Sequence, residues 1–123
     1  MQYLLLIYDQ EAQFASMSEK EQMAIYQEYM ALVEELKERK IYIGGNPLKP
    51  TSTAATVRVR KGKKGVTDGP FAETKEQLGG YFLIEAKDLD EAIEVASRIP
   101  TARDGSIEVR PIQPIGRAQG AQG

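Results

Sequence analysis

The fold of this chain is decided by the stretch Asp68-Gly69-Pro70-Phe71-Ala72-Glu73-Thr74-Lys75-Glu76-Gln77-Leu78-Gly79-Gly80-Tyr81-Phe82. It begins with a turn signal, because Asp accepts local backbone hydrogen bonds, Gly adopts unusual dihedral angles and Pro stiffens the chain. An acid-rich polar segment follows, and the double glycine then opens an apolar run that predicts a strand over residues 80–86. The stretch therefore predicts a shaped loop that delivers the chain into a strand.

Further strands and two helices are predicted outside this stretch. The strands cover residues 2–8, 41–43, 54–60 and 106–112, and the helices cover residues 18–39 and 89–98. Residues 61–65 are typical of a hairpin turn, which leads into a short return strand at Val66 and Thr67. The cluster Gly44-Gly45-Asn46-Pro47 predicts a second turn of the chain.

Both helices carry sequence signals at their ends and along one face. Ser18 with Glu21 predicts a capping box, for which Ser16 with Glu19 is the competing choice, and Asp88 opens a similar box in the second helix. The residues whose helical spacing predicts the apolar face of the first helix are Met23, Tyr26, Tyr29, Met30, Val33 and Leu36. Those that predict the apolar face of the second helix are Leu89, Ala92, Ile93 and Ala96.

The order of elements is strand, helix, strand, inserted hairpin, strand, helix, strand. Without the hairpin this is the split βαβ, or ferredoxin-like, pattern of an α+β protein. Its helices pack on one face of the sheet and leave the other face bare. Residues 2–8 and 80–86 would place apolar side chains on this bare face, which is unfavourable for a monomer. We therefore expect a homodimer that buries face against face.

The chain length fits one domain. Of the 123 residues, residues 1–115 are expected to form this domain, and the Gly-, Ala- and Gln-rich tail, residues 116–123, is expected to be disordered. The first eight residues lack a basic segment and are interpreted as a strand rather than a signal peptide. No apolar run approaches the roughly 20 residues that span a bilayer, so a cytoplasmic location is expected.

The composition excludes several kinds of site. The chain has no Cys and no His, so disulfides, zinc–thiolate sites, iron–sulfur clusters and a Ser-His-Asp triad cannot be built from it. We expect neither a metal nor another cofactor. With 16 basic and 18 acidic residues, the net charge of −2 gives no attraction to nucleic acid or anionic membranes. The basic cluster Arg60, Lys61, Lys63 and Lys64 lacks interleaved aromatic residues and is typical of a soluble hairpin tip.

Asp68 and Gly69 are candidate ligand-binding residues, because their turn could aim a carboxylate into a pocket. The alternative is a purely structural turn, which is favoured since Asp-Gly is a common turn dipeptide. Arg58 is a further candidate, because a long charged side chain is less expected on a strand. With Glu108 and Arg110 it could form an anion site or an ion pair between subunits, although a structural salt-bridge network is the favoured interpretation.

The remaining candidates follow in the same loop. Glu73 and Lys75, with Glu76, could combine a carboxylate base with a cation that orients an anionic ligand. The favoured alternative is a solvated helical turn of mixed charge. Gly79 and Gly80 could let a ligand or the backbone of a partner approach closely. A bulge at the start of the strand explains the two glycines equally well.

Taken with residues 4–8, 56–58, 89–92 and 105–111, the stretch at 68–80 resembles the DGPF family, a branch of the YCII-related proteins. The resemblance extends from the first strand to the last. It implies a ferredoxin-like α+β fold that assembles as a dimeric α+β barrel. Members are often described beside extracytoplasmic-function sigma factors, so the resemblance also implies a link to a sigma-factor partner.

The wider YCII-related family is associated with a His–Asp pair that has been proposed as catalytic. The resemblance implies a His near the start of the first helix and an Asp just before the proline that closes the second. This chain has no His, and Ile99 precedes Pro100. An acid–base mechanism built on that pair therefore does not carry over.

Three functional hypotheses follow. The leading one is a dimeric small-molecule-binding or regulatory module that holds its ligand between the sheet and the loop at 68–80. The alternative is a dimeric-barrel enzyme, such as a lyase, an isomerase or a monooxygenase-like protein, that acts on a small organic acid. Glu73 or Asp68 would then be the base, and Arg58 or Lys75 would orient an anion. A buried carboxyl with a raised pKa facing an enclosed pocket would favour the enzyme. The third is a pure interaction partner of a sigma factor.

Overall fold

The computed structural model describes residues 1–115 of the chain. Within that range the elements are β1 (Gln2–Asp9), α1 (Glu11–Ala15), α2 (Glu19–Glu38), β2 (Tyr42–Pro47), η1 (Thr51–Thr53), β3 (Ala55–Arg60), β4 (Lys63–Asp68), β5 (Gln77–Glu85), α3 (Leu89–Ser97), η2 (Pro100–Arg103) and β6 (Ser106–Pro111), where η marks a short 3₁₀ helix. None of these helices is long and apolar enough to cross a membrane.

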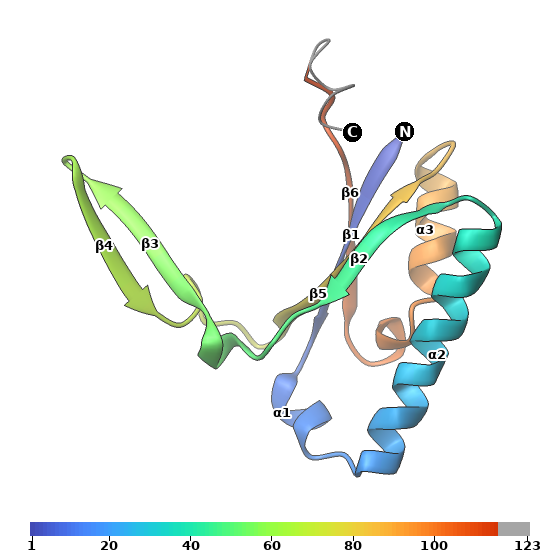
Figure 1. Cartoon of the computed structure of the whole chain (residues 1–123), viewed down its shortest axis with the longest axis horizontal. Helices are drawn as coiled ribbons and strands as arrows, with labels where there is room; N and C mark the ends of the chain where they lie inside the picture. The colour runs from blue at the N-terminus through green and yellow to red at the C-terminus, as the bar shows by residue number, and fades with distance from the viewer. Residues whose placement is uncertain (116–123) are drawn as a thin grey trace.

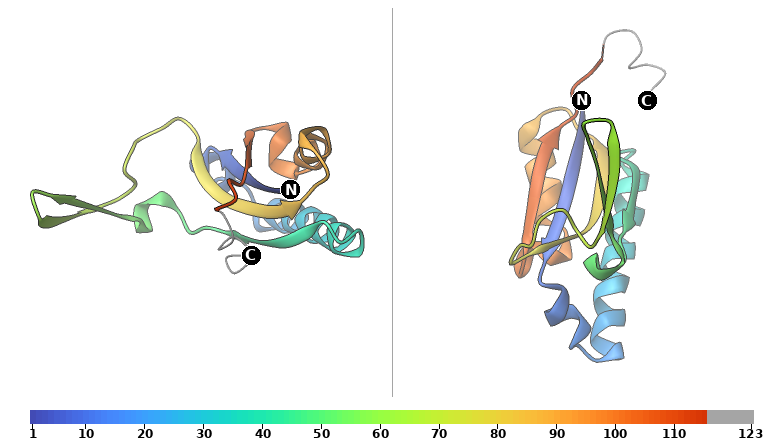
Figure 2. Two further views of the ribbon diagram at one scale, coloured as in Figure 1. Left: turned by 90° about the horizontal axis from the view of Figure 1, so that it is seen from above. Right: turned by 90° about the vertical axis from the view of Figure 1, so that its left-hand side faces the viewer.

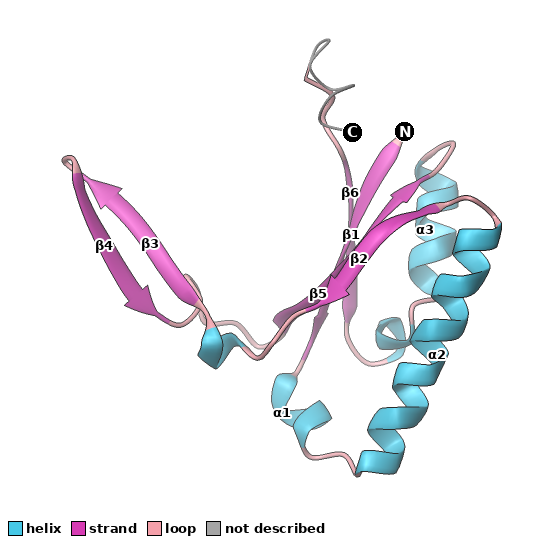
Figure 3. Cartoon of the chain, in the orientation of Figure 1, coloured by secondary structure: helices cyan, strands magenta, loops and turns pink. Residues whose placement is uncertain are grey.

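The main sheet has four antiparallel strands in the order β2-β5-β1-β6. Helices α2 and α3 lie on one face of it (Figure 1), and this arrangement of two helices on one side of an antiparallel sheet is the split βαβ pattern. The predicted α+β class and ferredoxin-like fold are therefore confirmed. Strands β3 and β4 form a separate two-stranded sheet that stands away from the main sheet, on the side opposite the helices (Figures 1 and 3).

The core lies between the main sheet and the two helices. Alternation along β1 turns Tyr3, Leu5 and Ile7 toward the helices, and all three are buried. Leu36 of α2 and Ile84 of β5 complete the centre, where both side chains are fully buried. Each such aliphatic side chain contributes about 1.5–3 kcal/mol by leaving water.

The other face of the main sheet is covered by no element of residues 1–115 (Figure 2). Leu4, Leu6 and Leu83 are neighbours on this face, because Leu4 pairs with Leu83 and Leu6 with Tyr81 across β1 and β5. These side chains are only partly buried. We call this surface the open face.

Helix α2 begins as predicted, but the prediction of its apolar face was partly wrong. Ser18 accepts a hydrogen bond from the Glu21 amide and Glu21 accepts one from the Ser18 amide, which is the expected capping box. The side chains that α2 buries are Leu32 and Leu36. Met23, Tyr26 and Met30 are instead more than half exposed. The physical reason is that the first half of α2 extends beyond the end of the sheet, where only the short α1 lies beside it (Figure 1).

Helix α3 buries a face displaced from the predicted one. Ala92, Val95 and Ala96 are buried, whereas Leu89 and Ile93 are about half exposed. Small alanine side chains let the helix approach the sheet closely, and the larger Leu89 and Ile93 side chains stay partly in water. The Asp88 side chain caps the helix by accepting a hydrogen bond from the Glu91 amide.

Two turns were predicted at the wrong places. Residues 44–47 continue β2 as a strand, in which Gly45 pairs with Phe82. A Cβ atom on Gly45 would lie 2.6 Å from the backbone oxygen of Tyr81, so the glycine serves close strand pairing rather than a turn. The hairpin turn is confined to Lys61 and Gly62, with φ angles of 51° and 75°. A two-residue turn of this hand fits the twist of paired strands, which lengthens β4 beyond the predicted return.

Candidate functional site

A cavity of about 540 Å³ lies on the helix side of the main sheet, at the end where α1 is found. It is partly open and is lined by the end of β1, by α1, by the first half of α2, by parts of β2 and β5, and by η2. We call it the helix-side cavity. The apolar residues of its lining include Phe14, Met17, Ile25, Tyr26, Met30 and Leu48. Tyr26 and Met30, which the sequence assigned to the core, therefore line this cavity instead.

The helix-side cavity exists because α2 is longer than the sheet beneath it. Helix α1 approaches the first turns of α2, where the Gln22 side-chain amide donates to the Phe14 carbonyl at 2.9 Å. The sheet side is kept open by glycines, since Gly45, Gly79 and Gly80 all belong to the lining. The cavity is thus a space between two helices and the end of the sheet, lined mainly by apolar groups.

Asp9 brings a carboxyl group into this apolar cavity. It is the last residue of β1 and follows Tyr3, Leu5 and Ile7 in the series that faces the helices. Removal of the carboxyl from water raises its pKa above the ordinary value, and the nearby charges of Glu11 and Glu76 raise it further. Asp9 is the one carboxyl group in residues 1–115 whose pKa is found to be raised.

A bulge and a glycine give Asp9 its surroundings. The pairing of β1 with β5 shifts between Ile7 and Tyr8, so that Gly79 is left out of the ladder. Bulges of this kind commonly redirect side chains near functional sites. A Cβ atom on Gly79 would meet the Asp9 carboxylate oxygen at 3.5 Å, so any larger side chain there would occupy the space beside the carboxyl group.

Tyr29 supplies a hydroxyl group to the same cavity. Its oxygen shares a hydrogen bond with the Thr101 hydroxyl, and its ring meets Phe82 edge-on with centroids 6.1 Å apart. Burial raises the pKa of the Tyr29 hydroxyl, and the charge of Asp9 adds to this effect. The two groups are therefore close enough to influence each other, although they come from β1 and α2.

Glu11 lines the cavity, but its carboxylate has a structural role. Its two oxygens accept hydrogen bonds from the Thr51 amide and hydroxyl, both at 2.7 Å. Its own amide donates to the Gln77 side chain at 3.0 Å. Glu11 thereby ties α1 to η1 and to the start of β5. The other carboxyl groups of the lining belong to Asp9, Glu34 and Asp104, and among them the pKa of Asp9 is raised.

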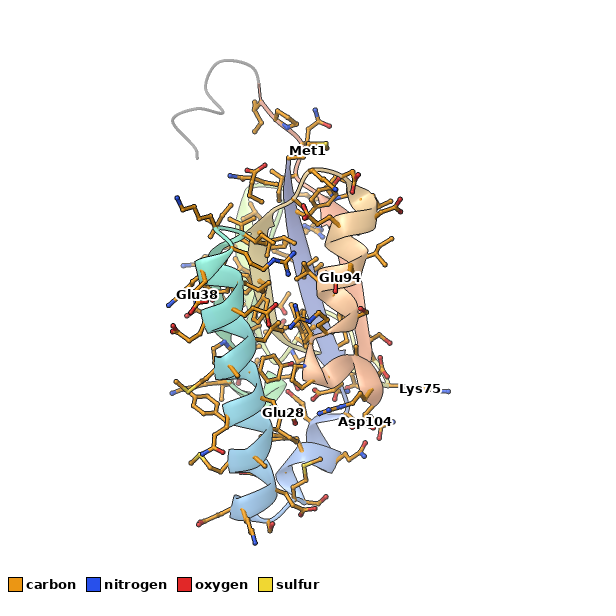
Figure 4. The ribbon with its side chains drawn as sticks, turned by 90° about the vertical axis from the view of Figure 1, so that its right-hand side faces the viewer. Met1, Glu28, Glu38, Lys75, Glu94 and Asp104 are labelled. Carbon is orange, nitrogen blue, oxygen red and sulfur yellow. The ribbon has the colours of Figure 1, made fainter. Side chains whose placement is uncertain are left out.

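Charged side chains also belong to the lining of the cavity, among them Lys37 and Arg103. Arg103 of η2 makes a two-pronged ion pair with Glu28 of α2, with both distances at 2.9 Å. This pair lowers the pKa of Glu28 through the hydrogen bonds from the guanidinium group. Figure 4 shows Glu28 on α2 and Asp104 just after η2, at the end of the molecule where α1 lies. The ion pair joins the two helical elements that flank the cavity.

Two of the site residues predicted from sequence line the helix-side cavity, namely Gly79 and Gly80. The bulge that was the alternative explanation for them is also present. Lys75 lies elsewhere, in a shallow depression beside Tyr8 and Glu108. The Glu73 side chain is exposed in the loop before β5, and this loop has no helical turn.

The other predicted site residues belong to the β3–β4 hairpin. Arg58 is exposed within β3, and Asp68 is exposed at the end of β4. Gly69 has a φ of 97° and donates from its amide to the Ala54 carbonyl at 2.7 Å, which closes the base of the hairpin as a structural turn would. Arg110 pairs with Glu108 at 2.7 Å, so these two form the salt bridge that was expected, without Arg58.

Sequence reasoning missed Asp9, Tyr29 and Thr101. The available signal was the alternation along β1, in which a carboxyl group takes the next core-facing position after three buried apolar residues. Within residues 1–115 no group of three or more acidic side chains is arranged to hold a metal ion. The arrangement that is present suits proton transfer and hydrogen bonding to an organic molecule.

Comparisons with known proteins agree with the fold. An uncharacterised protein of Rhizobium meliloti strain 1021 is 39% identical over 114 residues, which cover 91% of this chain and 92% of that protein. A solved structure of 5-chloro-2-hydroxyhydroquinone dehydrochlorinase from Burkholderia phenoliruptrix, in complex with 2,5-dihydroxybenzoquinone, is similar with a TM-score of 0.53 and 19% identity. That similarity covers 92% of this chain and 94% of the dehydrochlorinase, and it concerns the fold alone.

The family model of the YCII-related domain matches residues 1–116, almost the whole chain. The resemblance inferred from the loop at 68–80 is thereby confirmed, and the chain belongs to the YCII-related family.

Proposed function

We propose that this protein is an enzyme that transfers a proton to or from a small, ring-shaped organic molecule bound in the helix-side cavity. The observation that carries the proposal is the Asp9 carboxyl group, whose pKa is raised by its partial burial in a largely apolar cavity. A raised pKa makes the carboxylate a stronger base and brings its titration closer to neutral pH. Of the features expected of an enzyme, a buried carboxyl group with a raised pKa in an enclosed pocket, Asp9 has the raised pKa, at partial burial in a partly open cavity. Asp9 is not one of the residues predicted from sequence.

The cavity suits a small molecule in size and in chemistry. Its volume of about 540 Å³ lies within the range of roughly 300–1,000 Å³ that is usual for small-molecule sites. The rings of Tyr26, Tyr29 and Phe82 belong to its lining and fit a flat ring. The similar fold of a dehydrochlorinase that binds 2,5-dihydroxybenzoquinone supports an oxygenated six-membered ring as the class of ligand.

The proposed proton transfer uses Asp9 and Tyr29. The Asp9 carboxylate takes a proton from a saturated ring carbon next to a carbonyl group, and the electron pair of the broken C–H bond moves toward the carbonyl oxygen. The Tyr29 hydroxyl, whose position is fixed by its hydrogen bond with Thr101, can donate to the oxygen on which negative charge develops. Return of the proton at another carbon gives isomerisation, and loss of a leaving group from the adjacent carbon gives elimination.

A binding or regulatory module is the second candidate function. It uses the same helix-side cavity and holds the ligand without turnover. The absence of His from the chain favours it, because the commonest general base is missing. The link to a sigma factor rests on the family resemblance alone and belongs with this second candidate.

The assembly that we propose for either function is a homodimer that covers the open face. Leu4, Leu6 and Leu83 form an apolar surface in the middle of that face. A second copy that covers this surface would remove these side chains from water, and a two-fold axis would make the contact symmetric. This is the dimeric-barrel arrangement implied by the resemblance.

The test is the exchange of ring hydrogens for deuterium in 2,5-dihydroxybenzoquinone, followed by NMR in D₂O. In this compound the exchange begins with transfer of deuterium to a ring carbon, which becomes saturated, and ends with removal of the hydrogen from that carbon. The wild-type protein should accelerate the exchange, and Asp9→Asn should lower the acceleration by about 100-fold or more. The matched control is Asp90→Asn, which changes an exposed aspartate on α3 and should leave the rate unchanged.

Calorimetric titration of the same compound separates the two candidate functions. Binding by the wild type without accelerated exchange would favour the binding module over the enzyme. Equal exchange rates for Asp9→Asn and the wild type would contradict the role given to Asp9. The double variant Asp68→Asn with Glu73→Gln should bind the compound as the wild type does, and a loss of binding would return the site to the loop predicted from sequence.

A further inference from the structure

The β3–β4 hairpin, residues 55–68, is the largest feature that the proposed function leaves unexplained. We call it the arm. In the view from the side opposite the helices, the arm stands in front of the main sheet (right-hand view of Figure 2). Its strands are paired from Ala55 and Asp68 at the base to Arg60 and Lys63 at the tip. No element of residues 1–115 covers either of its faces.

The arm has one face on which its three valines gather and one face, the basic face, that carries most of its basic residues. Residues that pair directly across two antiparallel strands share a face, so the pairing of Val57 with Val66 places both on the same side. Val59 and Ala55 follow at intervals of two on this surface, which we call the valine face. Their cross-strand partners Lys64 and Asp68 lie at its two ends. The three valines have exposed fractions of 58%, 60% and 59% for Val57, Val59 and Val66. The opposite face carries Thr56, Arg58, Arg60, Lys63 and Thr67.

An apolar face on an isolated hairpin needs a partner surface. A two-stranded hairpin is marginally stable by itself in water. The alternation that would bury one side of a strand in a larger sheet is present here, but within the described chain it buries nothing. The valine face therefore has the composition of a docking surface, while the basic face has the composition of a surface that remains in water.

The base of the arm is fixed, which holds the arm away from its own sheet. Thr51 of η1 is held by the Glu11 carboxylate through two hydrogen bonds of 2.7 Å. On the returning side, Thr56 donates from its hydroxyl to the Gly69 carbonyl at 2.9 Å. Pro50 and Pro70 stand at the two connections and restrict the backbone there. The arm is thus presented outward rather than folded back.

We infer that the valine face of the arm docks on the open face of a second copy of this chain, so that each subunit clasps its partner. The open face offers the apolar side chains of Leu4, Leu6 and Leu83. The ion pair of Arg110 with Glu108 lies beside them on β6. One molecule carries both surfaces, and a two-fold axis lets both subunits make the same contact at once. The inference adds the arm to the proposed dimer and does not depend on any catalytic role.

The charge distribution also favours a second copy. Residues 55–68 contain five of the 16 basic residues of the chain and one of its 18 acidic residues. The arm therefore carries a net charge of +4, and the rest of the chain carries −6. A basic arm and an acidic body attract each other between copies, which steers their association and opposes the contact of arm with arm.

The test is sedimentation equilibrium of the full-length protein and of the triple variant Val57→Thr, Val59→Thr and Val66→Thr. Threonine keeps the shape and the strand preference of valine, so the hairpin is retained while its apolar face becomes polar. The dimer dissociation constant should rise by about 100-fold or more. A tenfold rise in this constant corresponds to a loss of about 1.4 kcal/mol in the free energy of association. The matched control is Thr56→Ser with Thr67→Ser on the basic face, which should leave the constant unchanged.

Hydrogen exchange of the wild-type protein gives a second measurement that needs no variant. The backbone hydrogen bonds of an undocked hairpin open easily, so its amide hydrogens exchange quickly. Protection of residues 55–68 should therefore increase with protein concentration and fall on dilution below the dissociation constant. A wild-type protein that stays monomeric at millimolar concentration overturns the inference. A dimer whose dissociation constant is unaffected by the triple variant also overturns the inference. It does so equally if Arg58, Arg60 and Lys63 are then found to bind nucleic acid.

Discussion

The main sheet and the arm use the same alternating pattern of apolar and polar residues, yet the pattern has opposite results in the two places. In β1 it buries Leu5 completely against α2 and α3. In the arm it leaves Val57 more than half exposed. The difference teaches that alternation specifies which side chains share a face, whereas the neighbouring elements decide whether that face is buried. A face without a neighbour in its own chain points to a neighbour from another.

The largest expected difference between the two regions comes from truncating one apolar residue in each of them to alanine. Leu5→Ala should lower the free energy of unfolding by about 2–5 kcal/mol, because it leaves a cavity in a packed core. Val57→Ala should change it by less than about 0.5 kcal/mol in dilute monomeric protein, since an exposed side chain loses little. Urea unfolding measures both. Equal losses in dilute protein would mean that the arm packs on its own chain.

A pair of glycine substitutions sharpens the comparison at intermediate size. Gly45→Ala in β2 places a Cβ atom 2.6 Å from the Tyr81 carbonyl oxygen, and the main sheet must move to accept it. We expect a loss of about 1–3 kcal/mol, as for other overpacked sites. Gly65→Ala in the arm meets its nearest neighbour, the Arg58 carbonyl oxygen, at 3.8 Å and should be neutral or slightly stabilising.

Thermal unfolding of the two variants beside the wild type checks this prediction. The result that contradicts it is a larger loss for Gly65→Ala than for Gly45→Ala. That result would mean that the strands of the arm are packed more tightly than those of the main sheet.

The smallest expected effect concerns the pH dependence of stability at the end of β1. The native pKa of Asp9 is raised, mainly by burial, so the native state holds this proton more tightly than the unfolded chain does. The free energy of unfolding should therefore fall as pH rises from the ordinary Asp range through the raised native pKa. The variant Asp9→Asn lacks the titrating carboxyl group, so its free energy of unfolding should not show this fall. As pH rises through the native pKa of Asp9, the variant should therefore become more stable relative to the wild type.

Urea midpoints measured for both proteins from about pH 4 to about pH 7 report the difference, since the ordinary pKa of Asp is near 3.9. Glu28 and Glu35, whose pKa values are lowered by Arg103 and Arg98, act with the opposite sign in both proteins and cancel. A difference that is constant with pH would contradict the raised pKa of Asp9.

The fold was largely predictable because its signals are local. The cap at Ser18, the alternation around Leu5 and the order of the elements all lie in short windows of sequence, and each of them is present. The turn at residues 44–47 was wrong because glycine has two uses, one in turns and one in close strand pairing. Only the position of Tyr81 on the next strand decides between them at Gly45.

The candidate site was much less predictable because it depends on distant contacts. Tyr29 and Thr101 share a hydrogen bond across 72 positions of sequence. Tyr26 lines a cavity only because α2 is longer than the sheet, a relation of lengths that no local pattern contains. Asp9 alone carried a local signal, as a carboxyl group in an apolar alternation.

The hydrogen bonds between Glu11 and Thr51 mean that the arm is not a separable module. The same carboxylate that holds the base of the arm is one of the two acidic neighbours that raise the pKa of Asp9. An insertion or deletion that lengthens the connection before β3 would therefore change the acidity of the cavity as well as the reach of the arm. If recombination exchanged the arm between relatives, function would be retained only when Glu11 and Thr51 came from the same parent. The segments that contain them, α1 and η1, are therefore expected to evolve as one unit.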